Sequence, residues 1–258
     1  MPFPNYPDKH KAASVLTGQD MIAYRYRLGR MPKIKSPEAV ILCLQRGLPE
    51  RLRRKFPYRK AGKLMGDLFL LKKTKRRVAV LTNIGVGAPS IGAIAEELIA
   101  WGVKQIISIS WAGGLQSNQN PGDIVICDKA IRDEGVSHHY LPSGKFVRAD
   151  SQLVIRITDA FQELGILASI GTTWTTDAPY RETSEEILEY QSEGIKTVEM
   201  EAAALFAIGQ VRNIKTSAIC VVGDSLANLK WEAPDDIQPI EDSLEVAYVA
   251  AIKAMDNL

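Results

Sequence analysis

Short apolar runs alternate along the chain with longer stretches in which apolar residues recur at helical spacing. The runs are rich in valine and isoleucine, a composition that favours buried strands. Strands are therefore expected at Ala39–Leu44, Arg77–Thr82, Gln105–Ser110, Asp123–Cys127 and Thr216–Val222. The alternation of strands with helices predicts an α/β fold with a largely parallel, twisted sheet that is flanked by helices.

The helical stretches have recognisable ends. The stretch Ser90–Trp101 is followed by Gly102, which ends helices readily. Further helices are expected at Ser151–Leu164, Ser184–Ser192 and Ser243–Met255. Short strands in the ranges 123–147 and 169–174 lack helices between them, so the sheet is expected to be mixed.

The first 35 residues differ from the rest, because they are polar and carry prolines at positions 2, 4, 7 and 32. We expect residues 1–35 to form an N-terminal extension packed on the domain or on a neighbouring subunit. Residues 36–258 then form a single α/β domain, a size that such folds often reach.

Composition narrows the class of protein. A hydrophobic content of 46% and a charged content of 24% are those of an ordinary globular protein, and a net charge of +2 argues against wholesale nucleic-acid binding. No apolar run has the length of a membrane span, and the first residues lack the regions of a signal peptide. With Cys43, Cys127 and Cys220 set in apolar runs, reduced thiols and a cytoplasmic location are expected.

The sequence offers no metal or cofactor motif. His138 and His139 are adjacent, so on a strand they point to opposite faces and do not share one ion easily. Gly85 and Gly87 resemble the start of a dinucleotide fingerprint, but the third glycine is missing. We therefore expect neither metal nor cofactor.

Residues 197–204 place two carboxylates where an apolar strand gives way to a helix. If the stretch is extended, Glu199 and Glu201 point to the same side and can accept hydrogen bonds from neighbouring hydroxyls, such as those of a ribose. Met200 adds a soft apolar surface. The alternative is that these residues start a helix, because glutamates stabilise the first turn of a helix.

Polar and glycine-containing segments follow the predicted strands, at the carboxyl ends where ligands gather in such sheets. One glycine after a strand is typical of a simple turn. Together the segments carry Arg, Ser, Thr, Asp and Glu side chains, which indicates a rim for a polar ligand. They lie at 47–51, 85–90, 110–114, 175–177 and 223–225.

On these residues the chain resembles the nucleoside phosphorylase family, which contains uridine phosphorylase and the trimeric or hexameric purine nucleoside phosphorylases. The resemblance runs from about Leu42 to Leu226. It rests on Gly-x-Pro-x-Arg at 47–51, the glycine-rich helix opening at 85–90, Gly-Gly-Leu at 113–115, Pro-Gly-Asp at 121–123, the block at 130–140 and Val-Glu-Met-Glu-Ala at 198–202.

The resemblance implies cleavage of a ribosyl C–N bond with phosphate, giving free base and ribose 1-phosphate. The partners would be a nucleoside and inorganic phosphate, and the assembly a homo-oligomer, either a dimer or a hexamer. The implied residues are Gly47 and Arg51 for phosphate, Glu199, Met200, Glu201 and His10 for ribose, Thr176, Arg181 and Asp224 for the base, and Glu201 and Asp224 for catalysis.

Some of these positions have other interpretations. Asp224 follows Gly223 and could cap a helix, and Arg181 could pair with Glu182 or Glu185. The segment 177–183 lacks the glutamine of the uridine enzymes, whereas Asp224 favours a purine. The sequence leaves the base open between purine and pyrimidine.

The chain also departs from the family's phosphate site. Ser108 replaces an arginine and Trp111 replaces a hydroxyl residue. Losing a guanidinium weakens anion binding unless another cation, such as Lys63 or Arg46, substitutes for it. Three hypotheses follow: a nucleoside phosphorylase, a nucleosidase that uses water, and a non-catalytic nucleoside-binding protein whose phosphate pocket is filled by Trp111.

Overall fold

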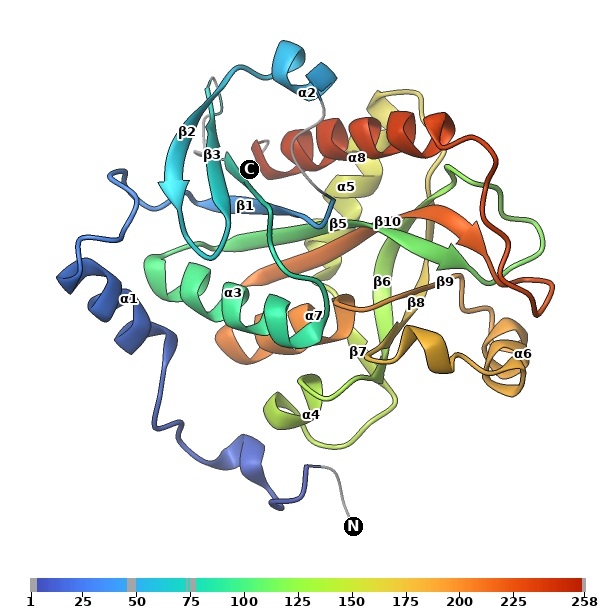
Figure 1. The fold of residues 1–258 in the computed structure, drawn as a ribbon, viewed down its shortest axis with the longest axis horizontal. Coiled ribbons are helices and arrows are strands. Elements are labelled where there is room, and N and C mark those ends of the chain that lie inside the picture. The colour runs from blue at the N-terminus through green and yellow to red at the C-terminus, as the bar shows by residue number, and fades with distance from the viewer. Residues whose placement is uncertain (1–3, 46–49, 73, 75–77, 257–258) are drawn as a thin grey trace.

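A mixed β-sheet runs through the molecule and helices cover both of its faces (Figure 1). The computed structural model describes residues 4–45, 50–72, 74 and 78–256. The strands are β1 (Ala39–Cys43), β2 (Tyr58–Lys63), β3 (Asp67–Leu71), β4 (Val78–Thr82), β5 (Gln105–Gly114), β6 (Ile124–Asp133), β7 (Phe146–Arg148), β8 (Ser169–Thr176), β9 (Thr197–Glu199) and β10 (Lys215–Ser225). The helices are α1 (Gly18–Arg27), α2 (Glu50–Lys55), α3 (Ala88–Trp101), α4 (Ser137–Tyr140), α5 (Ser151–Glu163), α6 (Ser184–Ser192), α7 (Ala202–Arg212) and α8 (Gln238–Asp256), with 3-10 turns η1 (Lys9–Lys11) and η2 (Pro179–Arg181).

The sheet closes on itself at one end. Its strands follow the order β10-β6-β8-β9-β5-β1-β4-β3-β2, and β10 also pairs with β5. Strands β5, β10, β6, β8 and β9 therefore form a closed ring, from which β1, β4, β3 and β2 extend as an open sheet. The expectation of a mixed sheet is confirmed, because β6 runs antiparallel to β10 but parallel to β8.

The predicted strands and helices are present, but several are longer than expected. The segments 110–114, 175–176 and 223–225, expected to follow the strands, are instead the last residues of β5, β8 and β10. Ring closure explains the difference, since each of these strand ends finds a pairing partner: Gly113 pairs with Val198, Thr175 with Glu199, and Asp224 with Gly113. The helix-cap interpretation of Asp224 is therefore wrong.

Two apolar layers sandwich the sheet. Helices α1, α3 and α7 pack on one face around residues such as Ile22, Leu98 and Phe206. Helices α5 and α8 pack on the other face around residues such as Phe161 and Tyr248. Figure 1 shows α3 and α7 side by side, with α1 on the outer flank of α3. A smaller cluster beneath α6 holds Trp174, one of its largest side chains.

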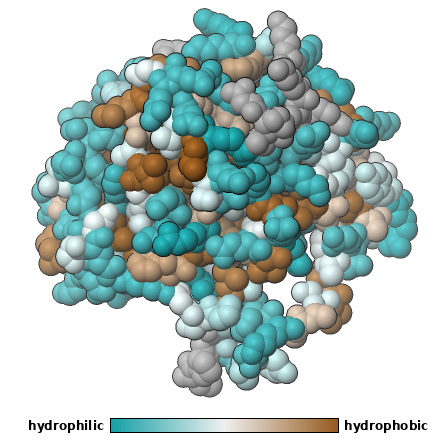
Figure 2. All heavy atoms as spheres, turned by 180° about the vertical axis from the view of Figure 1, so that it is seen from behind, coloured by the Kyte–Doolittle hydropathy of each residue, from teal (hydrophilic) through white to brown (hydrophobic). Residues whose placement is uncertain are grey.

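Some large hydrophobic side chains remain at the surface. Figure 2 shows the face opposite to that of Figure 1, where hydrophobic side chains occur in small groups among hydrophilic ones. Exposed examples on α5, on the connection that follows it and on β8 are Ile155, Ile166, Leu167 and Ile170. No helix in the described part of the chain is long and apolar enough to cross a membrane.

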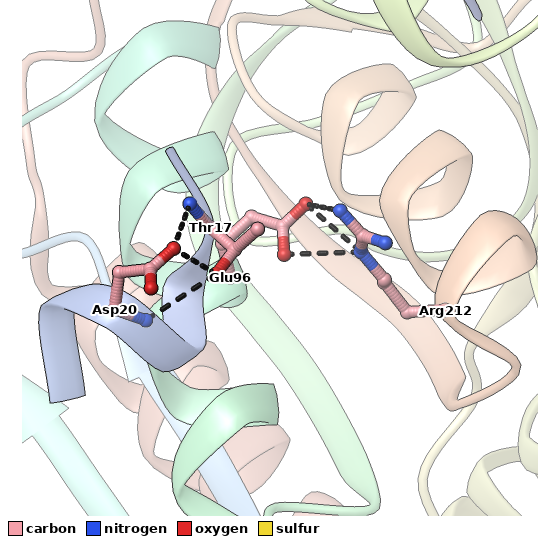
Figure 3. Close-up of polar contacts among 4 residues, drawn as sticks. All are labelled: Thr17, Asp20, Glu96 and Arg212. Carbon is pink, nitrogen blue, oxygen red and sulfur yellow. Dashed lines mark hydrogen bonds and ion pairs between the residues drawn. The ribbon is translucent and has the colours of Figure 1, made fainter. Parts of the chain in front are cut away.

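The N-terminal segment contains regular structure, contrary to its irregular, polar appearance. Thr17 and Asp20 form a reciprocal capping box that starts α1. A Cβ on Gly18 would lie 2.5 Å from the carbonyl oxygen of Glu96, so α1 approaches α3 more closely than another residue would permit. Figure 3 shows this cap beside Glu96, whose carboxylate binds Arg212 of α7 at 2.8 Å.

Candidate active site

The carboxylate of Glu199 starts a helix inside the protein. Strand β9 ends at Glu199 and α7 begins three residues later, so the chain is no longer extended at Glu201. The Glu199 Oε2 oxygen accepts hydrogen bonds from the backbone N–H groups of Glu201 at 2.8 Å and Ala202 at 2.7 Å. Its Oε1 oxygen accepts one from the Thr175 hydroxyl at 2.6 Å. Glu199 is thus an internal cap, and its oxygens are engaged by protein donors.

The Glu201 carboxylate joins the starts of two helices. Its Oε1 oxygen accepts a hydrogen bond of 2.6 Å from the backbone N–H of Gly87, the residue that caps α3. Its Oε2 oxygen accepts only a longer bond of 3.3 Å, from the N–H of Met200. Helix N-termini attract negative charge, so the starts of α3 and α7 both favour an ionised carboxylate here.

Burial opposes that ionisation. Glu199 and Glu201 are 6% and 3% exposed. Burial raises the pKa of both carboxyl groups, and the charge of Glu201 raises the pKa of Glu199 further. A cation formed beside Glu201 would favour the ionised carboxylate that burial disfavours, so the poorly solvated pair would in turn stabilise such a cation.

Strand pairing brings Asp224 towards the same edge of the ring. Gly113 pairs with Val198 of β9 on one side and with Asp224 of β10 on the other. A Cβ on Gly113 would lie 2.9 Å from Val198 Cγ1 and 3.3 Å from Asp224 Oδ1, so glycine permits this close approach. The Asp224 Oδ2 oxygen accepts a hydrogen bond of 2.6 Å from the indole N–H of Trp231.

A second carboxyl group, which sequence reasoning missed as a site residue, lies near Asp224. Glu182 is half-buried at the end of η2, immediately before the cap of α6. Burial raises its pKa to about 7, with the charges of Asp224 and Glu186 contributing. Its sequence signal is faint, because an acidic residue before a helix is common on any surface.

The two departures from the family pattern occupy different environments. Ser108 is buried inside β5, in register with Leu42 and Ala218. Trp111 is 42% exposed. Its ring covers Gly223, where an added Cβ would lie 3.2 Å from Trp111 Cε3. The indole thus shields the residue that precedes Asp224.

The remaining predicted residues are distributed as follows. Gly47 lies outside the described residues, and Arg51 belongs to α2. Thr176 is buried at the end of β8, and its hydroxyl accepts a hydrogen bond from the N–H of Ala178 at 3.2 Å. Arg181 is exposed on η2, and His10 lies on η1, which packs against α4 of the same chain.

Of the two candidates for a substitute cation, Lys63 lies in the described part of the chain. Arg46 lies outside the described residues. Lys63 is exposed at the end of β2, with its Nζ atom 4.0 Å from Asp67. The described residues also contain no group of three or more His, Cys, Asp or Glu side chains that could hold a metal ion.

The block 130–140 contains an arginine whose donors are used structurally. β6 and β7 pair as an antiparallel hairpin, and α4 lies in their connection. The guanidinium of Arg132 donates to the hydroxyl of Ser137 at 2.9 Å and to the carbonyl of Pro142 at 2.7 Å. Arg132 therefore holds this connection together.

Thr175 and Gly87 lie in segments that the sequence singled out, but the sequence did not predict their contacts with the two glutamates. The Thr175 hydroxyl donates to Glu199 and accepts from the N–H of Ala203 at 3.0 Å, which links β8 to α7. The glycine-rich helix opening was noticed, but its contact with Glu201 spans 114 positions of sequence. A local pattern carries no signal for such a contact.

Comparison with known proteins agrees with this geometry. Residues 38–256 match the family model described as the phosphorylase superfamily. A guanosine phosphorylase of Halorubrum lacusprofundi is 29% identical over 69% of this chain and 76% of its own length. A purine nucleoside phosphorylase of Streptococcus pneumoniae is 32% identical over 59% of this chain and 65% of its own length, just under two thirds.

Solved structures show the same fold. Purine nucleoside phosphorylase from Toxoplasma gondii, in complex with immucillin-H, superposes with a TM-score of 0.75 at 21% identity, covering 86% of this chain and 93% of its own. Uridine phosphorylase from Vibrio fischeri gives a TM-score of 0.73 at 22% identity, covering 86% and 92%. With its ring of strands, its buried carboxylate pair and a family match over most of its length, the chain belongs to the phosphorylase superfamily.

Proposed function

We propose that this chain is a nucleoside phosphorylase, which cleaves the ribosyl C–N bond of a nucleoside with phosphate to give free base and ribose 1-phosphate. The observation that carries the proposal is the Glu201 carboxylate, held by the N–H of Gly87 and buried beside Glu199. Membership of the phosphorylase superfamily and the nucleoside phosphorylases among its relatives support it.

Glu201 would act on the sugar. As the C–N bond breaks, the ribose gains positive charge and its hydroxyls become better hydrogen-bond donors. The Oε2 oxygen of Glu201, which has only one long protein contact, is the better placed of its two oxygens to accept from them. Because this contact strengthens as charge develops, it lowers the barrier more than it tightens substrate binding. Met200 would pack on the sugar.

Asp224 would act on the leaving base. A base that departs with added negative charge needs a proton or a hydrogen-bond donor, and the Asp224 carboxyl group is proposed as the general acid towards a purine ring nitrogen. Trp231 fixes the orientation of this carboxyl group through its indole N–H. Thr176 and Arg181, on β8 and η2, are proposed to contact the base from the other side of the rim.

The acceptor is either phosphate or water, and the two are distinguished by experiment. We propose that Gly47 and Arg51 bind phosphate, through the backbone N–H and the guanidinium respectively. The half-exposed ring of Trp111 favours the alternative acceptor, water, because an indole offers one donor and no charge to an anion.

The test is release of free base from inosine, adenosine, uridine and 5′-methylthioadenosine, with and without phosphate. Strict phosphate dependence with formation of ribose 1-phosphate is the expected result. Release that does not depend on phosphate would make the protein a nucleosidase. Binding without release from any nucleoside would mean a non-catalytic nucleoside-binding protein. Arg51→Ala should raise the KM for phosphate and leave that for the nucleoside nearly unchanged.

We propose a homo-oligomer, either a dimer or a hexamer, in which His10 reaches the sugar of a neighbouring subunit. The exposed apolar side chains Leu167 and Ile170 support burial of this surface in an assembly. Residues 36–258 are proposed as the single domain and residues 1–35 as its extension, in keeping with the family match at 38–256. The buried free cysteines fit a reducing, cytoplasmic environment. Sedimentation of the full chain measures the assembly.

A further inference from the structure

Helices α3 and α7 lie side by side and are joined near both ends (Figure 1). Their starts meet at the Glu201 carboxylate, which precedes α7 and accepts from the N–H of Gly87 at the start of α3. Further along, Glu96 of α3 binds Arg212 of α7. At a rise of about 1.5 Å per residue, the two contacts are about 14 Å apart along α3 and about 16 Å apart along α7. The helices therefore run in the same direction.

The contact between Glu96 and Arg212 is forked and partly shielded from water. Arg212 donates from Nη2 to Glu96 Oε1 at 2.8 Å and from Nε to both carboxylate oxygens at 3.0 Å (Figure 3). The side chain of Glu96 is 16% exposed and that of Arg212 is 37% exposed. Helix α1 covers this point, because Gly18 lies against the carbonyl oxygen of Glu96. A forked, shielded pair holds its geometry better than an exposed pair with one contact.

The packing between the two contacts is smooth. Gly92 of α3 faces Ile208 of α7, and a Cβ added to Gly92 would lie 3.6 Å from Ile208 Cδ1, an ordinary contact distance. Helices resist sliding where the side chains of one fit between those of the other. Because glycine has no side chain, this contact allows close approach but does not interlock the helices along their axes. The contacts near the two ends then set how α3 and α7 are aligned.

The starts of the two helices need such an alignment. Each helix start carries a partial positive charge equivalent to about half an elementary charge, so two converging starts repel each other. The Glu201 carboxylate offsets this repulsion only while it is ionised, and burial raises its pKa. The bond from the N–H of Gly87 lowers that pKa again. The spacing of α3 and α7 and the charge of Glu201 therefore depend on each other.

We propose that Glu96 and Arg212 are positioning residues for the reaction, whose ion pair aligns α3 with α7 so that the N–H of Gly87 reaches the Glu201 carboxylate. This inference rests on the proposed function and extends its machinery to a contact remote from the sugar. Without the pair, α3 shifts relative to α7, and a misplacement of about 1 Å at a catalytic group can reduce the rate by about 10²-fold. The loss falls on kcat more than on KM, because the contact of Glu201 with the ribose strengthens in the transition state.

The experiment compares Arg212→Ala and Glu96→Gln with Arg25→Ala, which breaks the adjacent ion pair between α1 and α3. In the first two variants, kcat for the nucleoside that is cleaved fastest should fall by about tenfold or more, with KM changed by less than about threefold. The double variant should lose no more than either single variant, because both residues act through one contact. Arg212→Lys keeps the charge and should retain most of the activity.

Arg25→Ala separates alignment from general loosening of the fold. Its partner Glu97 is more deeply buried than Glu96, with a side chain that is 7% exposed. The urea midpoint should therefore fall at least as far in Arg25→Ala as in Arg212→Ala. Its kcat should nevertheless match that of the wild-type protein, because this pair ties α3 to α1 and not to α7.

A second readout needs no turnover. Exchange of the Gly87 amide hydrogen, followed by NMR of protein with isotope-labelled glycine, reports on its bond to Glu201. Exchange should be faster in Arg212→Ala than in the wild-type protein or Arg25→Ala. The amide of Gly122, which bonds to the carbonyl of Val222 elsewhere in the fold, should exchange equally in all three.

The outcomes separate the inference from the function beneath it. Wild-type kcat in both single variants, additive losses in the double variant, or an equal loss of kcat in Arg25→Ala would overturn the inference and leave the proposed function in place. Failure of the wild-type protein to release any base would overturn the proposed function. Gly87 exchange then decides the inference: equal rates in Arg212→Ala and wild type would overturn it as well, whereas a faster rate in Arg212→Ala alone would support it.

Discussion

The carboxylate of Glu199 accepts a hydrogen bond of 2.8 Å from the backbone N–H of Glu201, so one member of the buried pair positions the other. Sequence spacing alone places the two glutamates on the same side of an extended chain. In the structure their contacts differ, because both Glu199 oxygens accept short bonds from protein donors, whereas Glu201 Oε2 has only the longer bond from the N–H of Met200.

Glu199→Ala should unfold at lower urea concentration than the wild-type protein. The substitution leaves the backbone N–H groups of Glu201 and Ala202 and the hydroxyl of Thr175 without their acceptor. Each unsatisfied buried donor costs about 1–3 kcal/mol, so the free energy of unfolding should fall by at least about 2 kcal/mol. Glu163→Ala, at an exposed site, is the control. Equal midpoints for the two variants would contradict the capping role of Glu199.

Glu201→Gln should separate stability from activity. The pKa of the Glu201 carboxyl group is raised in the folded state. The folded protein therefore loses stability as the pH rises above the unfolded-state pKa of this group, near 4.5. The amide lacks that cost, so the variant should gain stability relative to wild type, and the gain should grow as the pH rises from about 5. Its kcat should fall by about 10²-fold or more. Urea titrations at several pH values measure the stability difference, and initial rates measure kcat. A stability difference between variant and wild type that shrinks with rising pH would contradict the prediction.

Gly87→Ala should damage the site through the backbone. Gly87 adopts a φ of 93°, in the region that side chains disfavour, and its N–H donates to Glu201. We expect a loss of about 1–2 kcal/mol in stability. The larger effect should be on kcat, because Glu201 moves with its donor. Gly165→Ala is the control, because Gly165 has a φ of 68°, has open space around it and is far from Glu201 in sequence. This variant should show the effect of backbone strain alone. Matching kcat losses in both variants would count against the role of Gly87.

Arg25→Ala should loosen the N-terminal helix. Arg25 of α1 binds the largely buried Glu97 of α3 through Nε at 2.7 Å and Nη2 at 3.0 Å. Removing it leaves that carboxylate without its cation, a loss of about 1–3 kcal/mol. Lys11→Ala, whose pair with Asp8 is exposed, should cost much less. Hydrogen exchange of the α1 amides, faster in Arg25→Ala only, is the discriminating readout.

The strands and most helices were predictable because their signals are local. A strand such as Ala39–Cys43 is buried on both faces, so every residue of it is apolar. The hairpin of β2 and β3 was missed because β2 carries Arg59, Lys60 and Lys63 and reads as a solvated turn. Helix α1 was missed because it lies in a polar segment and depends on α3 for its packing.

The candidate site was predictable as a set of segments but not as a set of contacts. The approach of Gly87 to Glu201 depends on the packing of α3 against α7, and the approach of Gly113 to both Val198 and Asp224 depends on closure of the ring. The position of Glu182 depends on α6 and the loop beyond Asp224, which meet only in the folded chain. No periodic pattern in the sequence indicates either set of contacts.

Closure of the ring also limits aggregation through exposed strand edges. A sheet edge with unpaired backbone groups invites another strand to pair with it, and β10 escapes this by bonding to β5 as well as β6. Among the described strands, β2 and the short β7 remain at an edge. The lysines and arginine of β2 make its edge repel a second copy. The same charged residues that made this strand hard to predict therefore protect its edge from pairing into fibrils.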